Sequence, residues 1–287
     1  MAEQQKEITI LHPWKIFFWE VFLFSLTFFF GLATALRLNI ILTNKGETLP
    51  FISFWQFIFS FLFATLFLIA LLSLKKFQRG KKLIFKTLFA FLIFLGGANT
   101  FSLWMPSVFA FTLIAILVFV WLKSSSILIH NFIIAFAIAG ISAFLGLSLS
   151  PLTVVLFLVL FSIYDWISVY KTKHMIKLAK EMIEARVPIA FICPQEISDL
   201  GASLKEIQPG GKFLILGGGD VAFPLLLSVS LLPEGILSAI LIAIFALIGL
   251  STSFLIFINQ KTREPIPALP PIALCSIIGF LVTRLIS

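Results

Sequence analysis

Nine apolar stretches, each close to the length that crosses a lipid bilayer, run through the 287 residues of this chain. A transmembrane helix needs about 20 mainly apolar residues, because the hydrocarbon core is about 30 Å thick and a helix rises about 1.5 Å per residue. We therefore predict an all-α membrane protein with nine transmembrane helices. The stretches lie near residues 16–36, 51–74, 83–104, 107–122, 127–148, 151–170, 213–232, 236–258 and 267–286.

The composition agrees with a chain that is surrounded by membrane lipid. Hydrophobic residues make up 60% of the sequence and charged residues only 12%, whereas soluble domains carry about 25% charged residues. A soluble enzyme is therefore excluded. The formal net charge is +8, but the basic residues lie in short connections between apolar stretches, so we expect no nucleic-acid partner.

The histidines and cysteines do not form a metal-binding pattern. The only cysteines are Cys193 and Cys275, and the three histidines are His12, His130 and His174. None of them has the spacing of a zinc site or of a zinc protease motif. We expect structural roles for the histidines, and we expect neither a metal nor a cofactor.

The basic residues are unevenly divided between the two sides that nine spans create. The side with the amino terminus carries 18 of the 21 lysines and arginines, and the other side carries only Arg37, Lys45 and Arg284. Cytoplasmic connections carry an excess of basic residues in membrane proteins. We therefore expect a multi-pass protein of the cell membrane, with its amino terminus in the cytoplasm and its carboxyl terminus outside.

The longest connection divides the chain into three parts. We expect helices one to six in residues 1–170, a cytoplasmic loop in residues 171–212, and helices seven to nine in residues 213–287. Apolar residues from Met175 to Ile183 share one helical face of the loop, which predicts an amphipathic helix at the membrane surface.

Two short runs near the end of this loop have a different character. Residues 189–193 and residues 212–216 are apolar and rich in isoleucine and phenylalanine. Such residues favour strands, so the runs allow strand-like edges at the membrane surface.

Two aspartates lie inside apolar stretches at matched depth. Asp165 lies six residues before Lys171, and Asp220 lies eight residues after Lys212. At the rise of a helix, both carboxyl groups are about 9–12 Å below the same surface, which puts them nearer the cytoplasmic face. An ionisable group within a membrane span indicates a functional site.

Such a pair has a definite chemistry. Two nearby carboxylates do not both ionise cheaply, so one can act as a base and the other as an acid on the same water molecule. This is the division of labour that peptide hydrolysis requires. Another acid, Glu20, lies about one turn inside Lys15, and we expect its side chain to reach back to water without a functional role.

Three short motifs resemble those of a known family. Their order and spacing are similar to the Y-D, G-x-G-D and P-A-L motifs of the presenilin and signal peptide peptidase family of intramembrane aspartyl proteases, and Pro270 extends the third motif to the presenilin form. The motifs are Tyr164-Asp165, Gly217-Gly218-Gly219-Asp220 and Pro267-Ala268-Leu269.

The resemblance implies an aspartic endopeptidase that cuts the transmembrane segments of single-span membrane proteins. It implies that Asp165 and Asp220 are catalytic, and that a turn at Pro267-Ala268-Leu269 helps to shape the substrate site. We place Tyr164 and the glycines at 217, 218 and 219 at this site as well. In this family the substrate unwinds and adds a strand near the start of the seventh span, which is β-augmentation.

The length of the loop refines the resemblance. About 40 residues separate the two stretches that carry the aspartates, which is similar to the archaeal presenilin homologues. This compact form makes an obligate accessory subunit unexpected. The glycines before Asp220 have two open interpretations, since they allow either close approach of the backbone or close packing of helices.

Two other functions use similar residues. A type IV prepilin peptidase also carries a G-x-G-D motif, but those enzymes typically have a lysine where Ala222 stands, and they lack P-A-L. A proton-coupled transporter or a cation leak channel can use two acids in a wet cavity. Ion flux that persists when proteolysis is blocked would indicate the second class.

Overall fold

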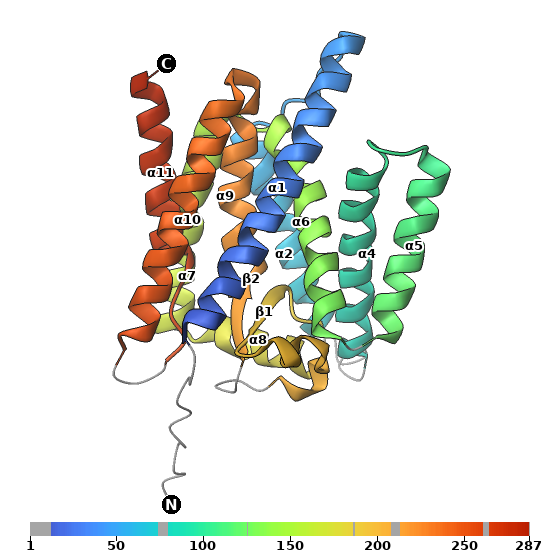
Figure 1. Cartoon of the computed structure of the whole chain (residues 1–287), viewed down its shortest axis with the longest axis vertical. Helices are drawn as coiled ribbons and strands as arrows, with labels where there is room; N and C mark the ends of the chain where they lie inside the picture. The colour runs from blue at the N-terminus through green and yellow to red at the C-terminus, as the bar shows by residue number, and fades with distance from the viewer. Residues whose placement is uncertain are drawn as a thin grey trace, which may run out of the picture.

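A computed structural model describes residues 13–73, 80–124, 126–185, 187–207, 213–260 and 264–286 (Figure 1). The chain is largely helical, and a single pair of short strands appears in this part of it. The helices are α1 (Pro13–Lys45), α2 (Phe54–Ser73), α4 (Lys81–Phe101), α5 (Ser107–Lys123), α6 (Ile127–Ser148), α7 (Pro151–Tyr170), α8 (His174–Glu184), α9 (Gly218–Ser230), α10 (Ile236–Ile258) and α11 (Leu269–Ile286), and the strands are β1 (Ala190–Pro194) and β2 (Phe213–Gly217).

Several helices have the length and composition of membrane spans. Within the described residues, six are long and apolar enough to cross a membrane: α1, most of α4, α6, α7, α10 and α11. The described apolar part of α2 and the whole of α5 are shorter, and α9 has only 13 residues. The structure therefore supports a multi-pass membrane protein with at least these six spanning helices.

The first span is longer than the sequence predicts. We expected it to end near residue 36, but α1 continues to Lys45. The residue after the helix is Gly46, which has a φ of +67°, a left-handed conformation that glycine adopts without steric cost. The amide of the following residue, Glu47, donates to the carbonyl of Leu42 at 2.9 Å.

The predicted seventh span is only partly helical, which corrects the prediction of a continuous span over residues 213–232. Residues 213–217 form β2, which pairs with β1 in antiparallel register from Ala190 opposite Gly217 to Pro194 opposite Phe213. The hydrogen bonds of this short run therefore come from another segment of the chain. Helix α9 begins directly after it, at Gly218.

The loop between α7 and β2 contains the expected amphipathic helix, α8. Leu178 is partly buried and Ile183 is buried, whereas Lys177 and Lys180 are exposed. Part of the apolar face of α8 therefore packs against the protein, whereas Met175 on the same face is exposed. Helix α8 and the two strands lie at the end of the molecule where α1 begins, and α11 ends at the opposite end (Figure 1).

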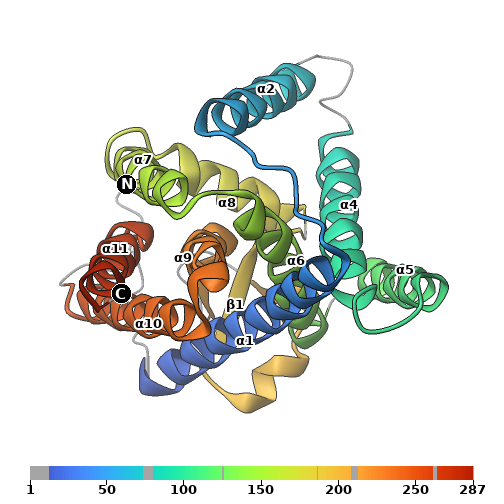
Figure 2. The ribbon, with the colours of Figure 1, turned by 90° about the horizontal axis from the view of Figure 1, so that it is seen from above.

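The short helix α9 lies at the centre of the helix bundle. Seen from above, it is surrounded by α1, α6, α7, α10 and α11 (Figure 2), and it packs against all five. Its apolar side chains, such as Val221, Leu225 and Leu227, are fully buried. The helix that carries Asp220 is thus the most enclosed helix of the bundle.

Candidate active site

Asp220 is held by the junction of a strand and a helix. Strand β2 leads into α9 without a loop, so that Gly217 is the residue before the helix and Asp220 is the third residue inside it. The carboxyl group accepts a main-chain hydrogen bond from Gly217, as an acidic side chain at this position does in a capping box. The positive end of the helix dipole also favours a carboxylate here.

Two of the three glycines before Asp220 lie so close to other atoms of the protein that a side chain would be crowded there. A Cβ atom at residue 217 would lie 2.8 Å from Asp220 Oδ2, and one at residue 218 would lie 3.1 Å from the carbonyl oxygen of Ile189. The N–H of Gly218 donates to that same oxygen at 3.0 Å. Close approach of the backbone therefore explains Gly217 and Gly218, whereas Gly219 is exposed.

Asp165 lies in the last two turns of α7 and is tied to the start of α11. Its Oδ2 atom accepts a hydrogen bond from the main-chain N–H of Leu269 at 3.3 Å. Leu269 is the first residue of α11, so its N–H has no partner within the helix. The carboxylate of Asp165 supplies that partner, and the helix dipole favours its negative charge.

The predicted Pro267-Ala268-Leu269 motif leads the chain into α11. Residues 264–268 are neither helix nor turn, which differs from the turn expected at this motif. Pro267 is buried, and Leu269 is 3% exposed in an apolar cluster with Leu158 of α7 and Leu227 of α9. The motif therefore packs between the two helices that carry the aspartates.

The structure brings most of the predicted site residues together. Asp165 and Asp220 are close enough to repel one another electrostatically, although no hydrogen bond joins their carboxyl groups. Gly217 and Leu269 each donate a main-chain hydrogen bond to one of the pair. Tyr164 directly precedes Asp165 on α7, and its side chain is 51% exposed.

One edge of the two-stranded sheet is closed by α6. The side-chain amide of Asn131 donates to the carbonyl of Ile192 at 2.8 Å and accepts from the amide of Ile192 at 2.9 Å. Asn131 therefore takes the place of a neighbouring strand. The residue is 1% exposed. Sequence analysis did not identify it, although two adjacent polar residues, His130 and Asn131, interrupt an apolar stretch there.

The neighbouring His130 closes the same edge. Trp121 Nε1 can only donate, and it lies 3.2 Å from His130 Nδ1, so this nitrogen is the acceptor. His130 Nε2 then carries the hydrogen and donates to the carbonyl of Ala190 at 3.2 Å. Further along the strand, Pro194 has no amide hydrogen. The outer edge of β1 is thus largely occupied by protein groups.

The other edge of the sheet belongs to β2. Because both main-chain groups of Ile192 bond to Asn131, the pair Ile192 and Ile215 is a non-hydrogen-bonded pair of the ladder. The N–H and C=O of Ile215 consequently point away from β1. Among the described residues, none forms a hydrogen bond with these two groups. Ile215, on this edge, lies five residues before Asp220 in the sequence.

Glu20 does not reach back to water, which corrects the prediction from the sequence. The side chain is 6% exposed and faces the interior of the protein from α1, close enough to Asp220 to interact with it electrostatically. Helix α1 packs against both strands and α9, and this packing buries the acid. The sequence could not reveal it, because burial depends on segments almost 200 residues away.

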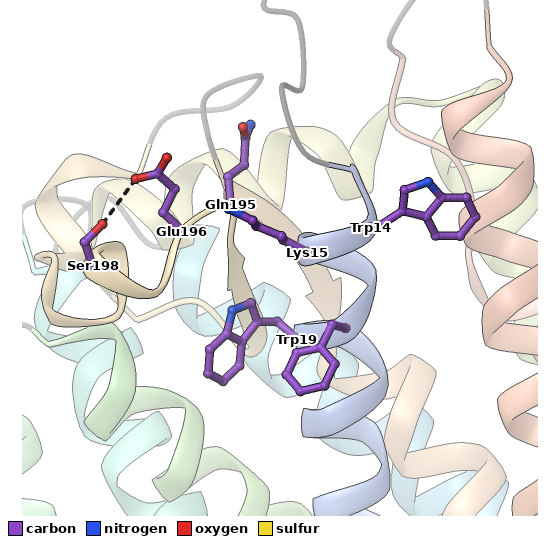
Figure 3. A pocket seen from close by; sticks show the side chains of 7 residues that line it. Trp14, Lys15, Trp19, Gln195, Glu196 and Ser198 are labelled. Carbon is purple, nitrogen blue, oxygen red and sulfur yellow. Dashed lines mark hydrogen bonds between the residues drawn. The ribbon is translucent and has the colours of Figure 1, made fainter.

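A separate pocket lies at the amino-terminal end of α1. It is formed between the first two turns of α1 and the segment after β1 (Figure 3), and it contains none of the predicted site residues. Ser198 donates to the Glu196 carboxylate at its rim at 3.3 Å. The described residues also include no group of three acidic, histidine or cysteine side chains that could hold a metal ion.

The fold of this chain is similar to that of solved membrane-protease structures. The structure of a presenilin family intramembrane aspartate protease in space group C222 is similar, with a TM-score of 0.61, 23% sequence identity, and coverage of 93% of this chain and 99% of that chain. The P2 form gives a TM-score of 0.56 at 23% identity, covering 92% and 97% of the two chains.

The sequence comparison places the chain within a family. Residues 20–287 match the family described as "Signal-peptide peptidase, presenilin aspartyl protease". The chain therefore belongs to this family of intramembrane aspartic endopeptidases. A comparison with curated proteins finds no match.

Proposed function

We propose that Asp165 and Asp220 are the catalytic pair, and that they hydrolyse peptide bonds within the transmembrane segments of single-span membrane proteins. The main support is that α7 and α9, which carry the two acids, pack against each other and against the start of α11. Each acid is also oriented by a main-chain N–H group, from Leu269 or Gly217. Oriented acids of this kind lose little entropy when the reaction begins.

The chemistry requires only the two side chains and a water molecule. The ionised carboxylate takes a proton from water as the oxygen attacks the scissile carbonyl. The protonated carboxyl group donates its hydrogen to the carbonyl oxygen and later supplies a proton to the leaving amine. Like charges at short distance keep one proton on the pair, so both forms are present together.

The substrate adds to the free edge of β2. An unwound substrate segment pairs with the N–H and C=O of Ile215, because the β1 edge is occupied by Asn131 and His130. The substrate then runs past Gly219 toward Asp220, and the Pro267-Ala268-Leu269 segment and Tyr164 border it. The sequence left two candidate edges for substrate pairing, residues 189–193 and residues 212–216, and the proposal selects the second.

A test of the catalytic pair uses the purified chain alone, because the proposed mechanism includes no accessory subunit. Asp165→Ala and Asp220→Ala should each abolish cleavage of a single-span substrate in detergent. Glu47→Ala is a matched control, because Glu47 is an exposed acid just after α1. Cleavage that survives either aspartate substitution would refute the mechanism, and ion flux that survives both would indicate a transporter.

The topology is part of the proposal. The chain crosses the cell membrane nine times, with α2, α5 and α9 as shorter spans, and the loop 171–212 separates spans one to six from spans seven to nine. The amino terminus and the catalytic pair lie toward the cytoplasm. Two observations support this orientation. The start of α1, helix α8 and the two strands lie at the same end of the molecule (Figure 1), and the connections predicted on that side carry the excess of basic residues.

Cysteine labelling from each side of the membrane tests this topology. In a chain with Cys193→Ser and Cys275→Ser, a membrane-impermeant maleimide added outside intact cells should label Glu47→Cys and not Ser198→Cys. Both positions are exposed. The reverse pattern would overturn the orientation, and labelling of both would overturn the placement of these segments on opposite sides.

A further inference from the structure

A third acid, Glu20, is buried beside the proposed catalytic pair. Its side chain is 6% exposed, and its Oε2 atom has no hydrogen-bond partner among the described residues. Burying a carboxyl oxygen without a partner is unfavourable. The packing of α1 against β1, β2 and α9 nevertheless holds the group there.

Among the described residues, the elements packed against Glu20 supply no positive charge to balance it. Helix α1 packs against α6, α9, α10, both strands and the short turn Leu232–Glu234. The described titratable groups on these elements are His130, Asp220, Cys193 and Glu234. His130 bonds to Trp121 and Ala190, and Glu234 bonds to Arg284 at the other end of the bundle. On α1 itself, Lys15 is exposed.

Asp220 and Cys193 are the groups that interact with Glu20 electrostatically. Burial raises the pKa of the Cys193 thiol well above its ordinary value, and the charge of Glu20 raises it further. The thiol therefore stays neutral and does not balance an acid. What remains is a set of three carboxyl groups, in which Glu20 interacts with Asp220 and Asp220 interacts with Asp165.

We propose that Glu20 is a positioning residue of the active site, whose charge sets how the proton is held by Asp220 and Asp165. The inference rests on the proposed function of the two aspartates and adds a third group to it. A negative charge on Glu20 opposes a second negative charge on the catalytic pair, because like charges repel in a poorly solvated site. Three coupled acids titrate as a unit.

The test is the pH dependence of cleavage by Glu20→Gln. Glutamine has the same shape but no negative charge, so the catalytic pair gives up its last proton more readily. The alkaline limb of the kcat/KM profile should therefore move to lower pH, by about one unit. A merely structural role of Glu20 would change the rate by the same factor at every pH and leave the midpoints in place.

Two further variants make the result specific. Thr27 lies seven residues further on the same face of α1, is fully buried and bonds to the carbonyl of Leu23, so Thr27→Val removes a buried polar group from the same helix face. Its pH profile should match that of the unmodified chain. Glu20→Asp keeps a titratable group and should move the profile less than Glu20→Gln does, and it serves as the test where Glu20→Gln does not fold.

The outcomes separate this inference from the proposed function. If Asp165→Asn and Asp220→Asn abolish cleavage but the Glu20→Gln and Glu20→Asp profiles coincide with that of the unmodified chain after scaling, the role of Glu20 alone is overturned. If either asparagine variant still cleaves substrate, the assignment of Asp165 and Asp220 as the catalytic pair is wrong. A profile that moves only in the Glu20 variants supports the inference.

Discussion

The main-chain N–H of Leu269 donates a hydrogen bond to Asp165 Oδ2, which joins residues 104 positions apart in the chain. The bond couples the start of α11 to one of the proposed catalytic acids. It also gives the Pro267-Ala268-Leu269 motif a physical role, because the buried side chain of Leu269 holds its own amide in place. The orientation of Asp165 therefore depends on packing between α7, α9 and α11.

Leu269→Ala should reduce activity more than its loss of stability explains. Removing a buried leucine side chain lowers the free energy of unfolding by about 2–5 kcal/mol, and here it also loosens the amide that binds Asp165. Ile272→Ala is the control, since Ile272 is buried on the same helix and does not bond to Asp165. Thermal unfolding and kcat should be compared. Equal loss of activity in both variants would contradict the coupling.

Gly217→Ala should lower kcat by about 100-fold, the effect of displacing a catalytic group by about 1 Å. The added Cβ would meet Asp220 Oδ2 at 2.8 Å, so the carboxylate must move. Gly201→Ala is the control, because a Cβ at this position has no neighbour within 4 Å. Full activity of Gly217→Ala in a steady-state cleavage assay would show that the geometry at Asp220 is not critical.

Asn131→Ala should destabilise the sheet. The substitution leaves the buried N–H and C=O of Ile192 without their partner, and each unpaired group costs about 1–3 kcal/mol. Ser276→Ala is the control, since it removes a buried hydrogen bond within α11 only. Unfolding in detergent should show a larger decrease for Asn131→Ala. Hydrogen exchange of the β1 amides should rise in that variant and not in the control.

Ile215→Pro should weaken substrate binding while largely preserving the fold. Proline removes an N–H that points away from β1, and loss of one hydrogen bond corresponds to about a 2- to 12-fold increase in KM. Leu214→Pro is the contrasting variant, because Leu214 lies opposite Cys193 at a hydrogen-bonded position of the ladder. That variant should lose stability first. An unchanged KM for Ile215→Pro would argue against substrate pairing at this edge.

Periodicity and length predicted the helices well where the chain has one dominant pattern. The expected stretches 127–148, 151–170 and 236–258 agree with α6, α7 and α10, because long apolar runs between proline, glycine and polar residues have few alternatives in a membrane. The run 213–217 was ambiguous, since five apolar residues fit a strand or a helix equally well. Pairing with β1 decided between them.

The sequence by itself determined that this is a multi-pass membrane protein, because apolar length is a local property. The similar depth of the two aspartates stays a prediction, and for Asp220 it assumed helical rise over residues that form β2. The sequence also carried the three motifs of the family. Only the tertiary structure decided that Leu269 binds Asp165, that Asn131 closes one edge of the sheet, and that Glu20 is buried beside Asp220. Each of these depends on contacts between distant segments, which no local pattern of residues encodes.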